Sequence, residues 1–309
     1  MATRLGDVAY LAWGDGPPAL FVHGVFLNAD LWQHQLAGLA DLRRCLAVDL
    51  LAHGESSFPA TGTLSMDLQA EMIVAFLDAL ALDAVDLVGN DSGGAIAQLV
   101  AVRAPERVRS LTLTNCDTHD NWPPAAFAPI RDLAVAGALA DALAAIALDP
   151  AAARASLASG FENPDLLSDG TIAGFFAPFA ASPARAEAVQ GYVAAMDNGV
   201  TVAIRDDLAR FGAPTLIVWG TADDFFDLAW ARWLADTIPG TVRCVELAGA
   251  KLFFPAERAE EFNAELREFW TTVPPPAAGT GPAGTGPAGT GPAVTGPAVT
   301  GPAVTGPAV

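Results

Sequence analysis

The sequence of 309 residues has few basic residues, few cysteines and no metal-binding motif. Sixteen lysine and arginine residues stand against 35 aspartate and glutamate residues, which gives a formal net charge of -19. Because a field of that sign repels phosphate, we expect neither nucleic acid nor an anionic membrane surface as a partner. The three cysteines lack C-x-x-C spacing and therefore do not indicate a disulfide framework. We expect no metal ion and no cofactor.

Long hydrophobic runs are also missing. The longest apolar stretch, residues 134–148, is interrupted by Asp141 and is too short to span a bilayer. The N-terminus has no apolar segment of the kind that a secretory signal requires. We therefore expect a cytoplasmic protein. With 52% hydrophobic residues, the chain is long enough for one large α/β domain with an inserted second layer.

The most informative segment is residues 86–95, Asp-Leu-Val-Gly-Asn-Asp-Ser-Gly-Gly-Ala. Apolar residues lead into a short turn bounded by glycine, and a helical run rich in alanine and leucine follows. A strand, a tight turn and a helix in that order are typical of a nucleophile elbow, G-x-nucleophile-x-G. Gly89 and Gly93 fit this frame, which puts Asp91 at the nucleophile position. A carboxylate there would attack carbon and form an ester with the enzyme.

Two other interpretations of this segment stay open. If Ser92 were the nucleophile, Asn90 would occupy the first glycine position and the helix would start one residue later. The segment would also suit an ordinary strand-to-helix turn in which an aspartate or serine caps the helix.

Three other strand-like segments give the elbow its context. Residues 19–26 end in a His-Gly turn, residues 46–56 run into a second turn, and residues 215–223 end on an acid. In this order the motifs resemble the α/β-hydrolase superfamily, over about residues 8–116 and 212–272. With aspartate at the elbow, the chain is most similar to haloalkane dehalogenases, haloacetate dehalogenases and epoxide hydrolases.

The resemblance assigns roles to residues around the elbow. The His-Gly turn would supply one backbone N–H of an oxyanion hole, from Val25 or Phe26, and the second would come from Ser92. His23 would lie beside the site. The acid that orients the catalytic base corresponds to Asp223, with the adjacent acid at position 224 as an alternative.

The chain departs from the family at the catalytic base. Leu252 stands where the family has its histidine, and no histidine follows His119. His119, with Asp117 or Asp120 as its orienter, would be a relocated base, or else a turn residue facing solvent. Lys251, the single lysine of the chain, would be a second substitute if its apolar loop lowered its pKa, or else a surface residue.

Features of the individual subclasses are also missing. The tryptophan or arginine that dehalogenases carry after the nucleophile is Ser92 here, and of the two cap tyrosines of epoxide hydrolases the chain has only Tyr192. Five aromatic residues between positions 122 and 226 favour an apolar or aromatic small-molecule substrate, or else belong mostly to the core. They are Trp122, Phe175, Phe176, Phe179 and Phe226.

Periodicity and composition divide the chain into four segments. Strand-like and helical runs alternate to residue 116 and return over residues 212–273, which predicts a mostly parallel sheet with helices on both faces. Residues 117–211 are rich in alanine and helical, and match the family's inserted cap. Residues 274–309 repeat a Gly-Pro-rich pentad, which favours a disordered tail.

Two functions follow from these observations. The first is an enzyme in which Asp91 attacks a saturated carbon, of an epoxide or an alkyl halide, and so belongs with the epoxide hydrolases and dehalogenases. The second gives Asp91 a role as acid or base in a ring opening, cyclisation or elimination, or leaves a protein that only binds a ligand. The intact elbow favours the first, because a strained turn costs stability. The missing histidine favours the second.

Overall fold

The computed structural model describes residues 1–58 and 63–272. The tail that the sequence predicts at 274–309 lies outside the described residues. No helix within the described ranges is long and apolar enough to cross a membrane.

A seven-stranded sheet forms the centre of the molecule, in the order β3-β5-β4-β6-β7-β8-β9. Only β3 runs antiparallel to its neighbour, and every other pair is parallel, so the predicted fold class is confirmed. A two-residue pair, β1 and β2, precedes it. The strands are β1 (Ala2–Thr3), β2 (Gly6–Asp7), β3 (Tyr10–Trp13), β4 (Pro18–Val22), β5 (Arg44–Val48), β6 (Val85–Asp91), β7 (Val108–Cys116), β8 (Thr215–Gly220) and β9 (Thr241–Leu247).

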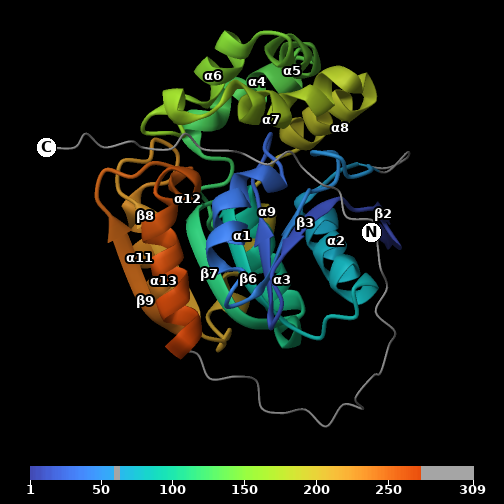
Figure 1. The fold of residues 1–309 in the computed structure, drawn as a ribbon. Helices are drawn as coiled ribbons and strands as arrows, with labels where there is room; N and C mark the ends of the chain where they lie inside the picture. Colours follow the sequence, from blue (N-terminus) through green and yellow to red (C-terminus); the bar gives the residue numbers. More distant parts are fainter. Residues whose placement is uncertain (59–62, 273–309) are drawn as a thin grey trace, which may run out of the picture. The chain divides into compact units, whose positions relative to one another are not determined.

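Helices cover both faces of this sheet (Figure 1). The step from β4 to β5 and the step from β5 to β6 go in opposite directions along the sheet. Because such crossovers are right-handed, the helices on these two connections lie on opposite faces. Accordingly α1 packs with α13, and α2 packs with α3. The helices around the sheet are α1 (Gln33–Leu39), α2 (Met66–Ala79), α3 (Ser92–Arg103), α11 (Leu228–Thr237), α12 (Phe254–Glu257) and α13 (Ala259–Thr272), with 3₁₀ turns η1 (Ala29–Trp32) and η2 (Pro105–Arg107).

The segment between β7 and β8 is helical, and its helices α4 to α8 lie together over one end of the sheet (Figure 1). Pro150, Pro164 and Pro183 mark turns in the sequence and begin α6, η4 and α8, because proline fits the first turn of a helix. The elements are η3 (Ala125–Phe127), α4 (Ala128–Val135), α5 (Leu139–Ala147), α6 (Pro150–Leu157), η4 (Pro164–Leu166), α7 (Asp169–Ala181), α8 (Pro183–Ala194), α9 (Gly199–Ala203) and α10 (Arg205–Leu208).

Candidate active site

The turn that joins β6 to α3 holds Asp91 in a backbone conformation that side-chain-bearing residues rarely adopt, with φ 56° and ψ −135°. The glycines on either side are packed tightly. A Cβ on Gly89 would lie 2.5 Å from the carbonyl oxygen of Gly93, and a Cβ on Gly93 would collide with the carbonyl oxygens of Val22 and His23. The packing therefore requires glycine at both positions, and it holds the strained turn in place.

The carboxyl group of Asp91 is almost completely buried against the backbone of Gly24, which lies between the end of β4 and the turn at Val25. Burial, and then the negative charge of Asp223, raise its pKa to about 7. Hydrogen bonds from the backbone N–H groups of Ser92 and Val25 act in the opposite direction. Of the two donors that the sequence left open, Val25 is thus the one that faces Asp91.

A second acid, Asp223, lies just past the end of β8. Its Oδ2 accepts a hydrogen bond from Asn115 Nδ2 at 2.6 Å, and its Oδ1 accepts one from the Phe225 N–H at 2.9 Å. Burial raises its pKa to about 6. The neighbouring Asp224 is exposed and pairs with Lys251 Nζ at 3.2 Å. Of these two acids, Asp223 is the one whose charge acts on Asp91.

A third acid, Asp117, follows β7 and is 2% exposed. Its backbone N–H donates to the Asp91 carbonyl oxygen at 3.4 Å. Burial, and then the charge of Asp91, raise the pKa of its carboxyl well above the usual range. From the sequence, Asp117 was expected only as an orienter of His119. Its position was nevertheless informative, because acids at the carboxyl ends of adjacent parallel strands meet at one edge of the sheet.

Leu252 is buried and lines the cavity in front of Asp91, and no histidine within the described ranges lines it. His23 has a structural task instead. Its Nε2 accepts a hydrogen bond from the Leu50 N–H at 3.0 Å, and its Nδ1 donates to the Gly24 carbonyl oxygen at 2.7 Å. Burial lowers its pKa to about 3, so the ring is neutral. His23 therefore fixes the turn that presents Val25 and does not face the cavity.

His119 does not take the place of the missing base. Its ring stacks on Trp233 of α11, with ring centroids 4.8 Å apart and planes 7° apart, and packs edge-on against Trp230. The chain turns at His119, with φ 50°, and this directs the ring away from the Asp91 carboxyl toward α11. Lys251, whose ammonium group is bound by Asp224 and the Ser159 carbonyl oxygen, does not line the cavity either.

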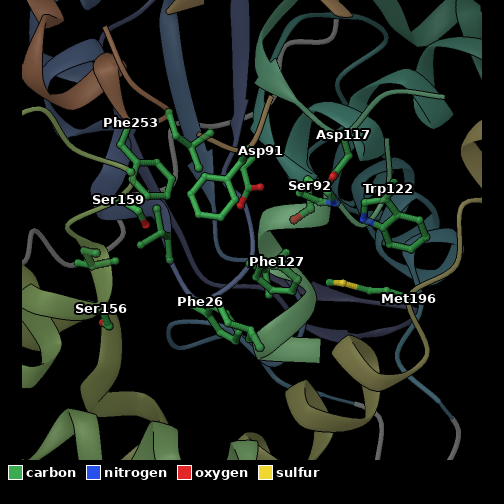
Figure 2. Close-up of a pocket in the computed structure, with 18 residues that line it drawn as sticks. Phe26, Asp91, Ser92, Asp117, Trp122, Phe127, Ser156, Ser159, Met196 and Phe253 are labelled. Atoms are coloured by element: carbon green, nitrogen blue, oxygen red, sulfur yellow. The ribbon is translucent and has the colours of Figure 1, made fainter. Parts of the chain in front are cut away.

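The cavity in front of Asp91 is mostly apolar (Figure 2). Tyr192 lines an adjoining cavity, and Trp122 lines both. The phenylalanines that the sequence suggested at 175, 176, 179 and 226 belong to the buried core. The cavity is lined by Val25, Phe26, Leu27, Asp91, Ser92, Asp117, Trp122, Pro124, Phe127, Ile130, Ser156, Leu157, Ser159, Gly160, Met196, Phe225, Leu252 and Phe253.

The geometry is that of a strand-turn-helix elbow beneath a helical layer, and comparison with known families agrees. The family described as "alpha/beta hydrolase fold" matches residues 17–257. The chain belongs to the α/β-hydrolase fold family.

Individual members of the α/β-hydrolase family place the chain near the dehalogenases. It is 32% identical over 279 residues to haloalkane dehalogenase 2 of Mycobacterium tuberculosis, a match that covers 85% of this chain and 91% of that protein. Est816, described as an N-acyl homoserine lactone degrading enzyme, is 29% identical with a TM-score of 0.67, over 85% of this chain and 96% of that one. Haloalkane dehalogenase DbeA from Bradyrhizobium elkani has the same fold, with a TM-score of 0.74 at 22% identity, over 88% and 97% of the two chains.

Proposed function

We propose that this α/β-hydrolase-fold enzyme uses Asp91 to attack a saturated carbon of a neutral, apolar small molecule. The Asp91 carboxylate forms a new C–O bond, and the electron pair of the breaking bond leaves with the ring oxygen of an epoxide or with a halide. The product of this step is an alkyl ester on Asp91. The reaction needs no cofactor.

The observation that carries this proposal is the position of the Asp91 carboxyl. It lies on a strained elbow at the wall of an apolar cavity, where the backbone N–H groups of Val25 and Ser92 favour its ionised form. These donors fix the carboxylate for attack. They would also stabilise the oxyanion that forms when water adds to the ester carbonyl.

Ser92 is a poor alternative nucleophile in this environment. Its Oγ is buried without a hydrogen-bond partner within the described ranges, so no base is in contact with it. A serine hydroxyl is a weak nucleophile unless an adjacent base removes its proton. Asp91, in contrast, is nucleophilic as soon as it is ionised.

The cavity favours a neutral substrate. Three carboxyl groups, Asp91, Asp117 and Asp223, lie at its wall or directly behind it, so an anionic substrate would be repelled. The remaining surface is mainly aliphatic and aromatic, and it provides favourable burial for hydrocarbon groups.

One observation favours a second function. A carboxyl with a pKa of about 7 is present in both protonation states near neutral pH, which suits a general acid or base. Asp91 would then move a proton in a ring opening, cyclisation or elimination without forming an ester. The missing histidine would be no obstacle to such a reaction.

Intact-mass spectrometry separates the two functions. The protein is incubated with an aryl epoxide and, separately, with a primary alkyl bromide, and the modified peptide is mapped. We expect a covalent adduct on Asp91 that is absent in Asp91→Asn and retained in Ser92→Ala. Substrate consumption without any adduct or incorporation of solvent oxygen into Asp91 would support acid–base chemistry instead. An adduct that persists in Asp91→Asn would refute the nucleophile assignment.

A further inference from the structure

A buried carboxyl without a hydrogen-bond partner lies beside Asp91 in the same cavity. Asp117 is only 2% exposed, and its Oδ1 is inaccessible to solvent. Even so, Oδ1 has no hydrogen-bond partner within the described ranges. Figure 2 shows Asp117 next to Ser92, on the same side of the pocket as Asp91. Buried polar atoms are nearly always bonded, so an unbonded one at a cavity wall indicates a group that bonds to the ligand.

The backbone around Asp117 is fixed, which leaves only its carboxyl group free. The Gln98 side chain donates to the Asp117 carbonyl oxygen at 2.9 Å, and the Asp117 N–H bonds to Asp91. The Cys116 Sγ is held between Gln98 and Thr118. The loop after β7 therefore presents one carboxyl into the cavity at a defined place.

The titratable groups around Asp117 favour its neutral, protonated form. Asp91 faces it from the elbow, Cys116 adjoins it on β7, and Tyr192 faces it from α8. Burial raises the pKa of the Cys116 thiol and of the Tyr192 phenol far above neutrality, so neither is charged. The negative charge that acts on Asp117 is that of Asp91, and two adjacent carboxyls share a proton more readily than both ionise.

We infer that Asp117 is the proton donor for ring opening at Asp91, and that the substrate class is therefore epoxides. This inference rests on the proposed function, and it supplies a step that Asp91 alone cannot perform. A halide leaves as a stable anion without a proton. The oxygen of an epoxide would leave as an alkoxide, which is strongly basic and needs a proton donor in an apolar cavity.

The reaction balances with these two residues and one water. Asp91 Oδ attacks the epoxide carbon, the C–O bond breaks, and the ring oxygen takes the proton of Asp117, which yields a hydroxyalkyl ester and an Asp117 carboxylate. Water then adds to the ester carbonyl carbon while Asp117 removes its proton. The diol oxygen leaves with that proton, and the protonated Asp91 returns a proton to Asp117. The sum is an epoxide plus water giving a diol.

Tyr192 is less well placed for this role. Its hydroxyl is also buried without a partner, but it lines the adjoining cavity, and Trp122 lies between the two spaces. A substitution Tyr192→Phe should therefore slow ring opening less than a substitution of Asp117.

The test compares two electrophiles in one variant. Adduct formation is followed by mass spectrometry in Asp117→Asn, with an aryl epoxide that needs a proton and an alkyl bromide that does not. We expect the epoxide rate to fall about 10²-fold or more, and the bromide rate to stay the same or rise. The bromide reaction also shows that the variant is folded. Asp120→Asn, on the exposed part of the same loop, is the matched control and should leave both rates unchanged.

The pH profile of the unaltered protein gives an independent result. The epoxide rate should rise as Asp91 ionises and fall as the pair loses its second proton, whereas Asp117→Asn should lose the alkaline fall. Equal effects of Asp117→Asn on both electrophiles, or an epoxide rate without an alkaline fall, would overturn the inference and leave Asp91 as the nucleophile. If only the epoxide reacts, the presence or absence of the alkaline fall in its pH profile decides whether Asp117 is the proton donor. An absence of adducts and of hydrolysis with both electrophiles would instead refute the proposed function itself.

Discussion

Strand β6 carries a buried aspartate at each end, and the surroundings of the two carboxyls are opposite in charge. Near the start of β6, Asp86 is 1% exposed. Its carboxylate bonds to Arg43 Nε at 2.8 Å, to Arg109, and to Ser110 Oγ at 2.7 Å. At the other end, Asp91 is nearly as buried but is faced by Asp117 and Asp223. No ion pair joins Asp91 to a cationic side chain within the described ranges.

The difference separates a structural carboxylate from a functional one. The charge of Asp86 is compensated by two guanidinium groups, so that it ties β6 to β7 and to Arg43, which precedes β5. No cationic side chain within the described residues pairs with Asp91, only the backbone N–H groups of Val25 and Ser92 favour its charge there, and ionising it works against folding. A group that lowers stability in this way is expected at a site where its reactivity is used.

Asp86→Asn should give the largest loss of stability. It would leave Arg43 and Arg109 without their counter-charge at a buried position, and breaking such a pair typically costs about 3–5 kcal/mol of unfolding free energy. Urea denaturation measures the change. The control is Asp207→Asn in an exposed pair with Arg210, which should leave the midpoint unchanged. Equal behaviour of the two variants would show that Asp86 is not a structural ion pair.

Asp91→Asn should change the unfolding free energy in the opposite direction and stabilise the protein. Because the pKa of Asp91 is raised to about 7, the protonated form is favoured in the folded state, and its stabilising contribution is lost as the pH rises from about 4 through 7. At about 1.4 kcal/mol per pKa unit, the substitution should stabilise the protein by roughly 2–4 kcal/mol at pH 8 and by much less at pH 5. Thermal melts at both pH values check this. A lower melting temperature at pH 8 would mean that the Asp91 charge is compensated after all.

Leu252→His should make the surroundings of Asp91 more like those of Asp86, because it gives Asp91 a basic neighbour. If Asp91 forms an ester, a histidine at this cavity position should speed release of the ester by about 10²-fold. The decay of the adduct in intact-mass spectra measures the rate. Leu252→Gln adds polarity without a base and should not accelerate release. If the two variants release the ester equally fast, base catalysis does not limit this step.

Much of the fold was predictable because its signals are local. The strand-like segments predicted at 19–26, 46–56 and 215–223 overlap β4, β5 and β8. Among the elements that sequence reasoning missed are β3, a short and partly exposed edge strand, and the helices α1 and α11. The segment after β9 forms two helices, α12 and α13, which are separated at Arg258.

The candidate site was predictable only where backbone geometry is encoded in glycine. The elbow at Asp91 follows from Gly89 and Gly93, since no other residue fits there. No comparable sequence pattern shows in which direction a side chain in a loop points. His119 follows a strand end as Asp117 does, yet it stacks on Trp233 while Asp117 lines the cavity. His23 likewise looked like a site residue, and only its hydrogen bonds show that it supports the turn.

The central claim is that Asp91 is buried with its charge uncompensated, and its titration tests this most directly. In protein labelled with ¹³C at the aspartate carboxyl carbons, the resonance that disappears in Asp91→Asn is followed from pH 4 to pH 9. The account predicts a midpoint near 7. A resonance that is fully ionised throughout this range would contradict it, because the carboxylate would then have a compensating partner, as Asp86 does.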